Sequence, residues 1–333
     1  MNFIEELQWR GMLHQMTPGI EELLAEGPQV AYIGFDPTAK SLTIGNYVQI
    51  MLLTLWQRSG NRPIMLMGGA TGRIGDPSGK DQERQLKTLD ELDNNLNAQV
   101  AQAKQLLDFD GPNGAILVNN LDFYQDMSAL DFLRNVGKTL TINYMLAKDS
   151  VKNRIETGMS FTEFSYQLLQ GYDFACLFRE HNCVVQMGGS DQWGNITGGI
   201  EFVRRQESGK VYAVTTPLLT KADGKKFGKS EAGNIWLGAD YTSPFEFYQF
   251  WLRSDDADLE KFIKYFSLKS RAEMEDMIAR IEENPQLVKK ELGEELTLRV
   301  HGEKGFKTAI NVTNLLYGRS AAAADLAELD APT

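Results

Sequence analysis

Short apolar runs alternate with amphipathic helical patterns through the first two-thirds of the chain. The runs that fit buried strands are Val30–Phe35, Pro63–Met67, Ala115–Val118 and Cys183–Met187. The segments that fit helices are Gly45–Ser59, Thr88–Leu107 with a capping box from Thr88 to Glu91, and Phe161–Arg179. Parallel strands need long crossover connections, which are usually helices. This order therefore predicts an α/β fold, a Rossmann-like domain built on a parallel sheet.

After Tyr241 only helical patterns follow. Ser243 and Ser270 each precede a glutamate at the third helical position, which is typical of a helix start. We therefore expect four regions along the chain. They are a Rossmann-like domain over residues 1–220 with a helical insertion around 120–160, a lysine-rich loop and linker over 221–240, a small all-helical domain over 241–319, and a flexible tail over 320–333.

Composition limits the class of protein. The 333 residues are 42% apolar and carry a formal net charge of −11. These values support a packed core and argue against a broad nucleic-acid-binding face. The first residues are acidic where a secretory signal needs bases, and no apolar run approaches the length of a membrane span. We expect a cytoplasmic protein with no membrane partner.

The residues that mark other catalytic classes are scattered. His14, His181 and His301 neighbour neither a nucleophile nor one another, and we interpret them as surface or cap residues. Cys176 and Cys183 match no metal or redox spacing, so we expect buried free thiols and no protein-bound metal. An enzyme with this sequence would work by positioning and electrostatics.

The segment 221–230 concentrates positive charge that packing does not explain. Lys221, Lys225, Lys226 and Lys229 lie within nine positions of an acidic protein. Lysine ammonium groups are rarely buried unpaired, and such a loop suits a phosphate group on which charge develops. A solvated basic turn is the alternative interpretation.

Two glycine-rich loops follow predicted strands, at residues 68–80 and 188–195. Glycine lets a backbone approach a ligand closely, although a tight turn also requires it. Neither loop has P-loop or nucleophile-elbow spacing, and we predict that Ser190 caps the following helix.

One face of the helix Phe161–Arg179 carries three polar side chains. Tyr166, Gln170 and Asp173 are spaced four and three apart, so they share that face. A pocket wall and a solvated polar face are both open interpretations at this point.

Taken together, these motifs resemble the bacterial-type tyrosyl-tRNA synthetases, a family of class I aminoacyl-tRNA synthetases. The matching stretches, in family order, are residues 32–39, 68–79, 160–166, 169–174, 188–196 and 226–230. Members of the family activate L-tyrosine with ATP and Mg²⁺ and then transfer the tyrosyl group to the 3′ end of tRNA(Tyr). The resemblance implies this activity, with ATP·Mg²⁺ as a substrate complex.

The resemblance also assigns the tyrosine-binding residues. They are Tyr32 and Asp173 at the phenol, Asp76, Tyr166 and Gln170 at the ammonium group, and Gln192 on the carboxylate side. A site built to hydrogen-bond a phenol is left with unpaired buried groups when phenylalanine binds. Tyrosyl-tRNA synthetases are the standard example of this discrimination, at about 10⁵-fold.

For the nucleotide, the resemblance implies two groups of residues. The ATP contacts are Asp36, Gly45, Asn46 and Asp191, with Thr38 at the γ-phosphate, and the cations around pyrophosphate are Lys80, Arg84, Lys226 and Lys229, the last two in a KMSKS-type loop. The tyrosine carboxylate attacks the α-phosphorus in line and needs no general base. The scattered histidines agree with that chemistry.

The sequence departs from the family at two places. The class signature His-Ile-Gly-His reads Thr43-Ile-Gly-Asn46 here, and we expect an active enzyme in which Thr43 contacts phosphate directly or through water. Bacterial members also carry a C-terminal RNA-binding domain of the S4 type, and this sequence ends without one. We therefore expect adenylate formation with poor tRNA charging. Arg204 and Arg205 match the acceptor-arm contact, or alternatively form a solvated helix end.

The family is dimeric, and the resemblance places Leu130–Arg154 and Phe161 at or near a homodimer interface.

Three alternatives to the ligase activity stay open. They are a catalytically weakened synthetase-like protein that binds RNA or regulates, a ligase for tryptophan or another amino acid, and a nucleotide-binding scaffold without ligase chemistry.

Overall fold

The computed structural model describes residues 2–78, 85–148, 151–152, 154, 158–224, 227–230 and 233–317. The chain forms two compact units. Unit 1 comprises Met1–Lys40 and Leu52–Leu218, and unit 2 comprises Ser41–Met51 and Leu219–Thr333. The division falls within helix α3 (Ile44–Arg58), and no sequence pattern predicted it.

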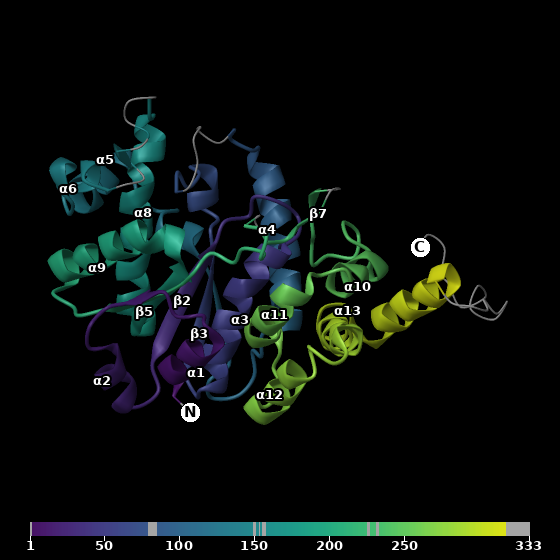
Figure 1. Cartoon of the computed structure of the whole chain (residues 1–333). Helices are drawn as coiled ribbons and strands as arrows, with labels where there is room; N and C mark the ends of the chain where they lie inside the picture. Colours follow the sequence, from purple (N-terminus) through teal and green to yellow (C-terminus); the bar gives the residue numbers. More distant parts are fainter. Residues whose placement is uncertain are drawn as a thin grey trace. The chain divides into compact units, whose positions relative to one another are not determined.

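Unit 1 is built on a six-stranded sheet with the order β1-β6-β5-β2-β3-β4. Its strands β5, β2 and β3 are labelled in Figure 1. The strands are β1 (Gln15–Met16), β2 (Val30–Phe35), β3 (Arg62–Met67), β4 (Ile116–Asn119), β5 (Cys183–Gly189) and β6 (Tyr212–Thr216). The four predicted strands are confirmed. The sheet is mixed, because β1 pairs antiparallel with β6 while all other pairs are parallel. With two residues, β1 is too short to produce a sequence pattern.

The helices of unit 1 include the three that the sequence predicted. Besides α3, the α-helices in the described part of this unit are α1 (Phe3–Arg10), α2 (Ile20–Ala25), α4 (Leu89–Leu106), α5 (Ala129–Asp131), α6 (Ile142–Leu146), α8 (Phe161–His181) and α9 (Trp193–Glu207). Short 3₁₀ segments are η1 (Thr71–Arg73), η2 (Asn120–Phe123) and η4 (Ser190–Gln192), and η3 (Phe132–Val136) is a π-helical turn. Thr88 caps α4. The second half of its predicted capping box is wrong, because the Glu91 carboxylate pairs with Lys87 instead.

Helices α8 and α9 pack against each other in unit 1 (Figure 1). At Gly171 an added Cβ would stand 2.9 Å from the Phe202 ring of α9, so glycine permits this close approach. The buried core at this interface also contains Tyr32 and Phe174, whose rings meet edge-on at 5.2 Å. Cys176 and Cys183 are buried free thiols, as predicted.

Within its described residues, unit 2 is helical apart from one short hairpin. Its elements are β7 (Lys229–Ser230), β8 (Gly233–Asn234), α10 (Pro244–Leu252), η5 (Asp256–Asp258), α11 (Leu259–Phe266), α12 (Arg271–Ala279) and α13 (Pro285–Tyr317). The capping boxes predicted at Ser243 and Ser270 are both formed. Helix α13 is interrupted at Gly302, which has φ +69°. His301 precedes that break and packs edge-on against Phe247 at 4.9 Å. Because its ring is partly buried, the surface interpretation is wrong for this histidine.

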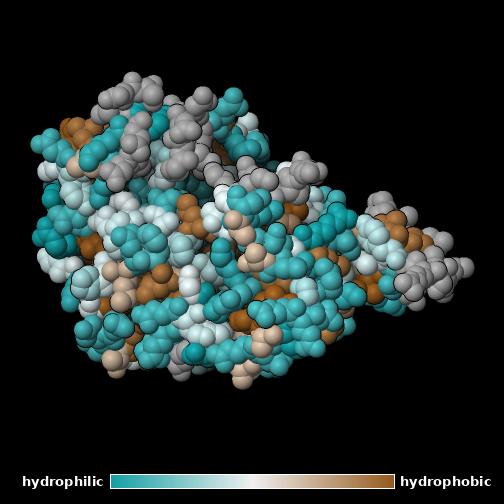
Figure 2. All heavy atoms as spheres, viewed as in Figure 1, coloured by the Kyte–Doolittle hydropathy of each residue, from teal (hydrophilic) through white to brown (hydrophobic). Residues whose placement is uncertain are grey.

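The face shown in Figure 2 is mostly hydrophilic, with scattered hydrophobic patches. The large exposed apolar side chains of unit 1 include Leu130, Leu133, Ile142 and Phe161, and one hydrophobic patch in Figure 2 lies over the α5–α6 region. Among the described residues, no helix is long and apolar enough to cross a membrane.

Candidate functional site

The Asp173 carboxylate of α8 is the centre of a buried polar network in unit 1. Its side chain is 2% exposed, and both oxygens accept hydrogen bonds. Tyr124 donates from its hydroxyl to Oδ1 at 2.7 Å, and Asn120 donates from Nδ2 to Oδ2 at 2.8 Å. Each carboxylate oxygen has two lone pairs. Asp173 can therefore accept a further hydrogen bond from a ligand.

The network continues from Asn120 to the carboxyl end of β2. Asn120 Nδ2 also lies 3.0 Å from Thr71 Oγ1, which donates to Asp36 Oδ1 at 2.6 Å. The Tyr166 hydroxyl donates to Asp36 Oδ2 at 3.0 Å. We call Asp36, Thr71, Asn120, Tyr124, Tyr166 and Asp173 the polar network. It shows that the polar face of α8 is buried, so the solvated-face interpretation is wrong.

The sheet topology explains why these residues meet. Asp36 follows β2, Thr71 follows β3 and Asn120 follows β4, at the carboxyl ends of neighbouring parallel strands. The chain order reverses between β2 and β5, and there Tyr32 lies opposite Gln186. In open α/β sheets, ligands bind beyond the carboxyl ends of strands at such a switch point.

Several buried polar atoms near this switch point and on α8 have no hydrogen-bond partner within the described chain, including Gln167 Nε2 and three atoms that concern the site. These three are the hydroxyl of Tyr32 and the Oε1 atoms of Gln170 and Gln186. Burying a hydroxyl or amide without a partner is unfavourable. Unpaired groups of this kind therefore indicate a ligand that supplies hydrogen-bond donors and acceptors.

Burial also sets the charge state of the network. Desolvation raises the pKa of Asp173 to about 7, and the nearby Asp36 charge adds to that rise, while the bonds from Tyr124 and Asn120 oppose it. The pKa of Tyr32 is raised well above its ordinary value by burial and by the Asp173 charge. Burial and the charges of Asp36 and Asp76 do the same for Tyr166. These phenols therefore stay protonated near neutral pH.

A second polar group surrounds Asp76 after β3. Gln192 donates from Nε2 to Asp76 Oδ2 at 2.8 Å, and the backbone N–H of Ser78 donates to Oδ1 at 2.9 Å. Asn195 donates to Ser78 Oγ at 3.0 Å. Asp76 and Gln192, which the resemblance assigned to the ammonium group and the carboxylate of the amino acid, are thus directly bonded.

The glycine-rich loops make room for site side chains. An added Cβ would stand 2.1 Å from Asp36 Oδ1 at Gly68, and 2.1 Å from Asn119 Oδ1 at Gly69. At Gly189 it would stand 2.5 Å from Asp191 Oδ1. The prediction that Ser190 caps a helix is wrong, because Ser190 begins η4 and neither η4 nor α9 has a side-chain cap.

In unit 2, Thr43 and Asn46 hold each other at the start of α3. The Thr43 hydroxyl and backbone N–H donate to Asn46 Oδ1 at 2.8 and 2.9 Å, and the Asn46 N–H donates back to Thr43 Oγ1 at 3.2 Å. This is a reciprocal helix cap. Thr43 therefore uses its hydroxyl proton on Asn46 and fixes the orientation of that amide.

The same unit holds the middle of the lysine-rich segment. Phe227 is buried against Phe250, Trp251, Phe262 and Phe266, with ring centroids 5.1–6.2 Å apart. Gly228 has φ +83°, and an added Cβ would stand 2.6 Å from the Ile44 side chain. The Ile235 N–H donates to the Gly228 carbonyl, and the Ile44 N–H to the Ile235 carbonyl. This segment and the start of α3 thus share one hydrogen-bonded array.

The remaining predicted residues are placed as follows. Thr38, Gly45 and Asp191 are exposed, and Lys229 begins β7. Lys80, Arg84 and Lys226 lie outside the described residues. Arg204 and Arg205 both pair with Glu201 of α9, whose pKa falls to about 2 through these bonds despite partial burial.

The residues that the structure brings to the site and that sequence reasoning missed include Thr71, Asn120, Tyr124 and Gln186. One usable signal was the position of Asn119 and Asn120 directly after a predicted strand, where ligand-binding residues gather. Tyr124 and Gln186 carry no such signal, because only the tertiary fold brings Tyr124 to α8 and Gln186 beside Tyr32.

Comparison with known proteins identifies the family. The family model for class I tRNA synthetases of the tryptophan and tyrosine type matches residues 24–318. The chain belongs to this family. This synthetase is therefore an aminoacyl-tRNA ligase, a class of enzyme that uses ATP, an amino acid and tRNA.

The synthetase is also similar to individual bacterial proteins. It is 54% identical over 322 residues to tyrosine–tRNA ligase of Cytophaga hutchinsonii, a match that covers 96% of this chain and 75% of the relative. It is 52% identical over 341 residues to the enzyme of Bacteroides fragilis, covering 100% of this chain and 79% of the relative.

Solved structures confirm the fold of the synthetase. A C-terminally truncated mitochondrial tyrosyl-tRNA synthetase of Aspergillus nidulans superposes with a TM-score of 0.85 at 29% identity, over 95% of this chain and 94% of that one. The tyrosyl-tRNA synthetase of Archaeoglobus fulgidus, solved with L-tyrosine, gives 0.67 at 18% identity, over 90% and 98% of the two chains. The latter similarity shows the fold alone.

Proposed function

We propose that Asp173 of the polar network and the nearby Tyr32 bind the phenol end of L-tyrosine. The tyrosine–tRNA ligase function itself follows from the relatives of that name, which are 51–54% identical over nearly the whole chain. The observation that carries the assignment is the contrast between the two groups. Asp173 is held by two donors and keeps lone pairs open, whereas the buried Tyr32 hydroxyl has no partner in the described chain.

The substrate phenol suits both groups at once. The phenol O–H donates a hydrogen bond to the Asp173 carboxylate. The phenol oxygen accepts a hydrogen bond from the Tyr32 hydroxyl. A phenylalanine side chain would leave the buried Tyr32 hydroxyl unpaired and would give the buried Asp173 carboxylate no donor, which is costly. A tryptophan side chain offers an N–H donor but no acceptor for Tyr32. Tyr32 with Asp173 therefore selects a phenol.

At the other end of the amino acid, we place the ammonium group with Asp76, Tyr166 and Gln170. Gln170 Oε1 is buried and unpaired in the described chain, and an ammonium group supplies donors for it. Asp76 contributes negative charge. The Gln192 amide donates to Asp76 in the structure. In the tyrosine complex we expect it to hold Asp76 and to face the substrate carboxylate from the same position.

The activation step needs orientation rather than proton transfer. A carboxylate oxygen of tyrosine attacks the α-phosphorus of ATP, a new C–O–P linkage forms, and the bond from that phosphorus to the bridging oxygen breaks. Pyrophosphate leaves with Mg²⁺, which belongs to the substrate complex. We propose Asp36, Gly45, Asn46 and Asp191 as nucleotide contacts, with Thr38 near the γ-phosphate. Asp36 already accepts bonds from Thr71 and Tyr166, so it also orders the tyrosine site.

The hydrogen bonds between Thr43 and Asn46 suggest a different role for each residue of the signature Thr43-Ile-Gly-Asn46. Since the Thr43 hydroxyl donates to Asn46 Oδ1, the amide Nδ2 of Asn46 is the group left to donate to phosphate. We therefore propose that Asn46 contacts the phosphate and that Thr43 orients it. Lys80, Arg84, Lys226 and Lys229 would neutralise the charge that develops on pyrophosphate.

Tyrosine-dependent ATP–pyrophosphate exchange tests the proposal. We expect exchange with L-tyrosine, none above background with L-phenylalanine or L-tryptophan, and strong loss in Asp173→Ala. The assignment would be overturned if the wild-type chain showed no exchange that depends on tyrosine, or if tryptophan supported exchange at a comparable rate. Aminoacylation of tRNA(Tyr) in the same preparation then checks the transfer step.

We further propose that the synthetase is a homodimer and that Arg204 and Arg205 contact the tRNA acceptor arm. The support for the dimer is the exposure of Leu130 (77%), Ile142 (67%) and Phe161 (71%) on one unit, because large exposed apolar side chains mark interaction sites. Sedimentation velocity of Phe161→Asp against the wild type tests it. A monomeric wild type would overturn the dimer, and unchanged tRNA charging in Arg204→Ala/Arg205→Ala would overturn the arginine contact.

A further inference from the structure

We propose that Tyr124 is a positioning residue for tyrosine selection, because its hydroxyl holds the Asp173 carboxylate ready to accept the substrate phenol. This inference rests on the proposed function, in which Asp173 binds the phenol. Tyr124 directly follows η2, and its hydroxyl lies 2.7 Å from Asp173 Oδ1. Nothing in the sequence or in the family resemblance singled out this residue.

The hydroxyl of Tyr124 stands between two acceptors. Besides Asp173 Oδ1, the carbonyl oxygen of Leu169 lies 2.9 Å away. A phenol has one proton, so it donates to one acceptor at a time. When Asp173 is ionised, the shorter bond to the charged oxygen is the stronger one. When Asp173 is protonated, it donates to the Tyr124 oxygen, and Tyr124 turns its own proton to Leu169.

The two arrangements differ in what they offer a substrate. In the first, Asp173 is an ionised acceptor with open lone pairs, which is the state that binds a phenol donor. In the second, Asp173 is neutral and its proton is committed to Tyr124. Tyr124 stabilises the first arrangement more, since a hydrogen bond to a charged group is roughly twice as strong as a neutral one.

The surroundings of Asp173 make this help necessary. Burial and the Asp36 charge raise the Asp173 pKa to about 7, and the Tyr124 bond is the first of the two contacts that lower it. The other titratable groups whose charges act with Asp173 are Tyr32 on β2 and Tyr166 and Cys176 on α8. Burial raises the pKa values of all three, so they are neutral near pH 7. None of them is a cation that could stabilise the ionised Asp173. Asn120 is the second donor and does not titrate.

The test is Tyr124→Phe, which keeps the ring and removes the hydroxyl. We measure kcat/KM for L-tyrosine in pyrophosphate exchange from pH 6 to 9. In the wild type, the acid limb of the profile should fall near pH 7. In the variant it should move upward by roughly one pH unit, because one charge-assisted bond is lost. The loss should be about tenfold at pH 6.5 and should disappear by pH 9.

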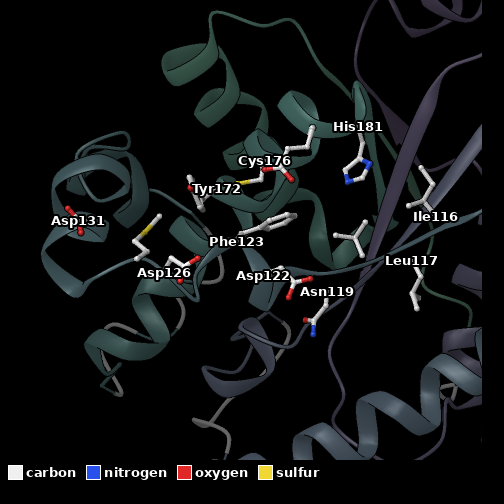
Figure 3. Close-up of a pocket in the computed structure, with 13 residues that line it drawn as sticks. Ile116, Leu117, Asn119, Asp122, Phe123, Asp126, Asp131, Tyr172, Cys176 and His181 are labelled. Atoms are coloured by element: carbon white, nitrogen blue, oxygen red, sulfur yellow. The ribbon is translucent and has the colours of Figure 1, made fainter.

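Tyr172→Phe is the matched control. The Tyr172 ring is 5.5 Å from that of Tyr124, but it faces an open cavity of about 660 Å³ together with Phe123 and Cys176 (Figure 3). Its hydroxyl is not a partner of Asp173. This variant should keep the wild-type pH profile.

The outcomes separate the inference from the proposed function. If the wild type shows no tyrosine-dependent exchange, the proposed function fails. If the wild type is active and Tyr124→Phe loses rate equally at all pH values, or keeps the wild-type profile, the positioning role is wrong. Calorimetric binding of L-tyrosine at pH 6.5 and 9 gives a second readout that needs no turnover. We expect the Kd of the variant to be raised about tenfold at pH 6.5 and to match the wild type at pH 9.

Discussion

Replacing Tyr32 by phenylalanine should raise the free energy of unfolding of the protein while weakening its binding of tyrosine. The Tyr32 side chain is 1% exposed, and its hydroxyl has no partner within the described chain. Burying such a hydroxyl costs about 1–3 kcal/mol in mutational data, and removing it relieves that cost. The small void left behind costs on the order of 1 kcal/mol. We therefore expect the free energy of unfolding to rise by roughly 0–2 kcal/mol. The edge-on contact with Phe174 is retained.

Tyrosine binding should change in the opposite direction. The variant loses one neutral hydrogen bond to the substrate phenol, worth about 0.5–1.5 kcal/mol. We therefore expect roughly a 3–10-fold higher KM for tyrosine. The discrimination against phenylalanine should fall as well, because phenylalanine no longer leaves a Tyr32 hydroxyl unpaired.

The assays are urea unfolding of the ligand-free protein and pyrophosphate exchange with each amino acid. Tyr47→Phe is the matched control. Tyr47 is equally buried, but its hydroxyl accepts a bond from Arg299 at 3.2 Å. Loss of this hydrogen bond should lower the free energy of unfolding by about 1–3 kcal/mol. If Tyr32→Phe destabilises the protein as Tyr47→Phe does, the Tyr32 hydroxyl has a partner in the free protein and the reasoning is wrong.

Three further predictions concern other parts of the chain. Arg154→Met should lower the free energy of unfolding by about 3–5 kcal/mol in urea, because Glu163 would lose its buried partner at 2.7 Å. The double variant Arg154→Met/Glu163→Leu should recover part of that loss, and additive losses would contradict this account. Lys229→Ala should slow pyrophosphate exchange about a hundredfold or more with unchanged tyrosine binding by calorimetry, and a mild loss would argue against its role at pyrophosphate. Burial lowers the pKa of His301 to about 4, so the unfolded chain binds its proton first. The contribution of His301 to the free energy of unfolding should therefore be fully present above pH 6.5. It should fall by up to roughly 1.4 kcal/mol per pH unit as the pH is lowered towards 4. In urea titrations at different pH values, His301→Gln should remove this pH dependence.

Much of the architecture could be predicted from the sequence because it depends on local patterns. The apolar run Val30–Phe35 is a strand with those bounds, and the serine caps at Ser243 and Ser270 form as expected. Hydrophobic periodicity and capping act over a few residues, so a single sequence contains them. The two-residue strand β1 forms only through pairing with β6, and no local pattern marks it.

The identity of several site residues was equally accessible to the sequence. Tyr166, Gln170 and Asp173 share a helical face by spacing alone. Whether that face met water or a ligand depended on what packs against α8. The structure shows that the face is buried rather than solvated, because Asn120 after β4 and Tyr124 after η2 bond to Asp173.

The sequence by itself indicated the family, the strand–helix order, and Tyr32 and Asp173 as the residues that we propose at the phenol. Only the tertiary structure decided how those residues are paired and charged. Asp173 has a pKa near neutrality because burial and Asp36 raise it while Tyr124 and Asn120 lower it. Residues brought together from more than forty positions away exert these effects. Electrostatic energies depend on distance and burial, and a linear sequence contains neither quantity.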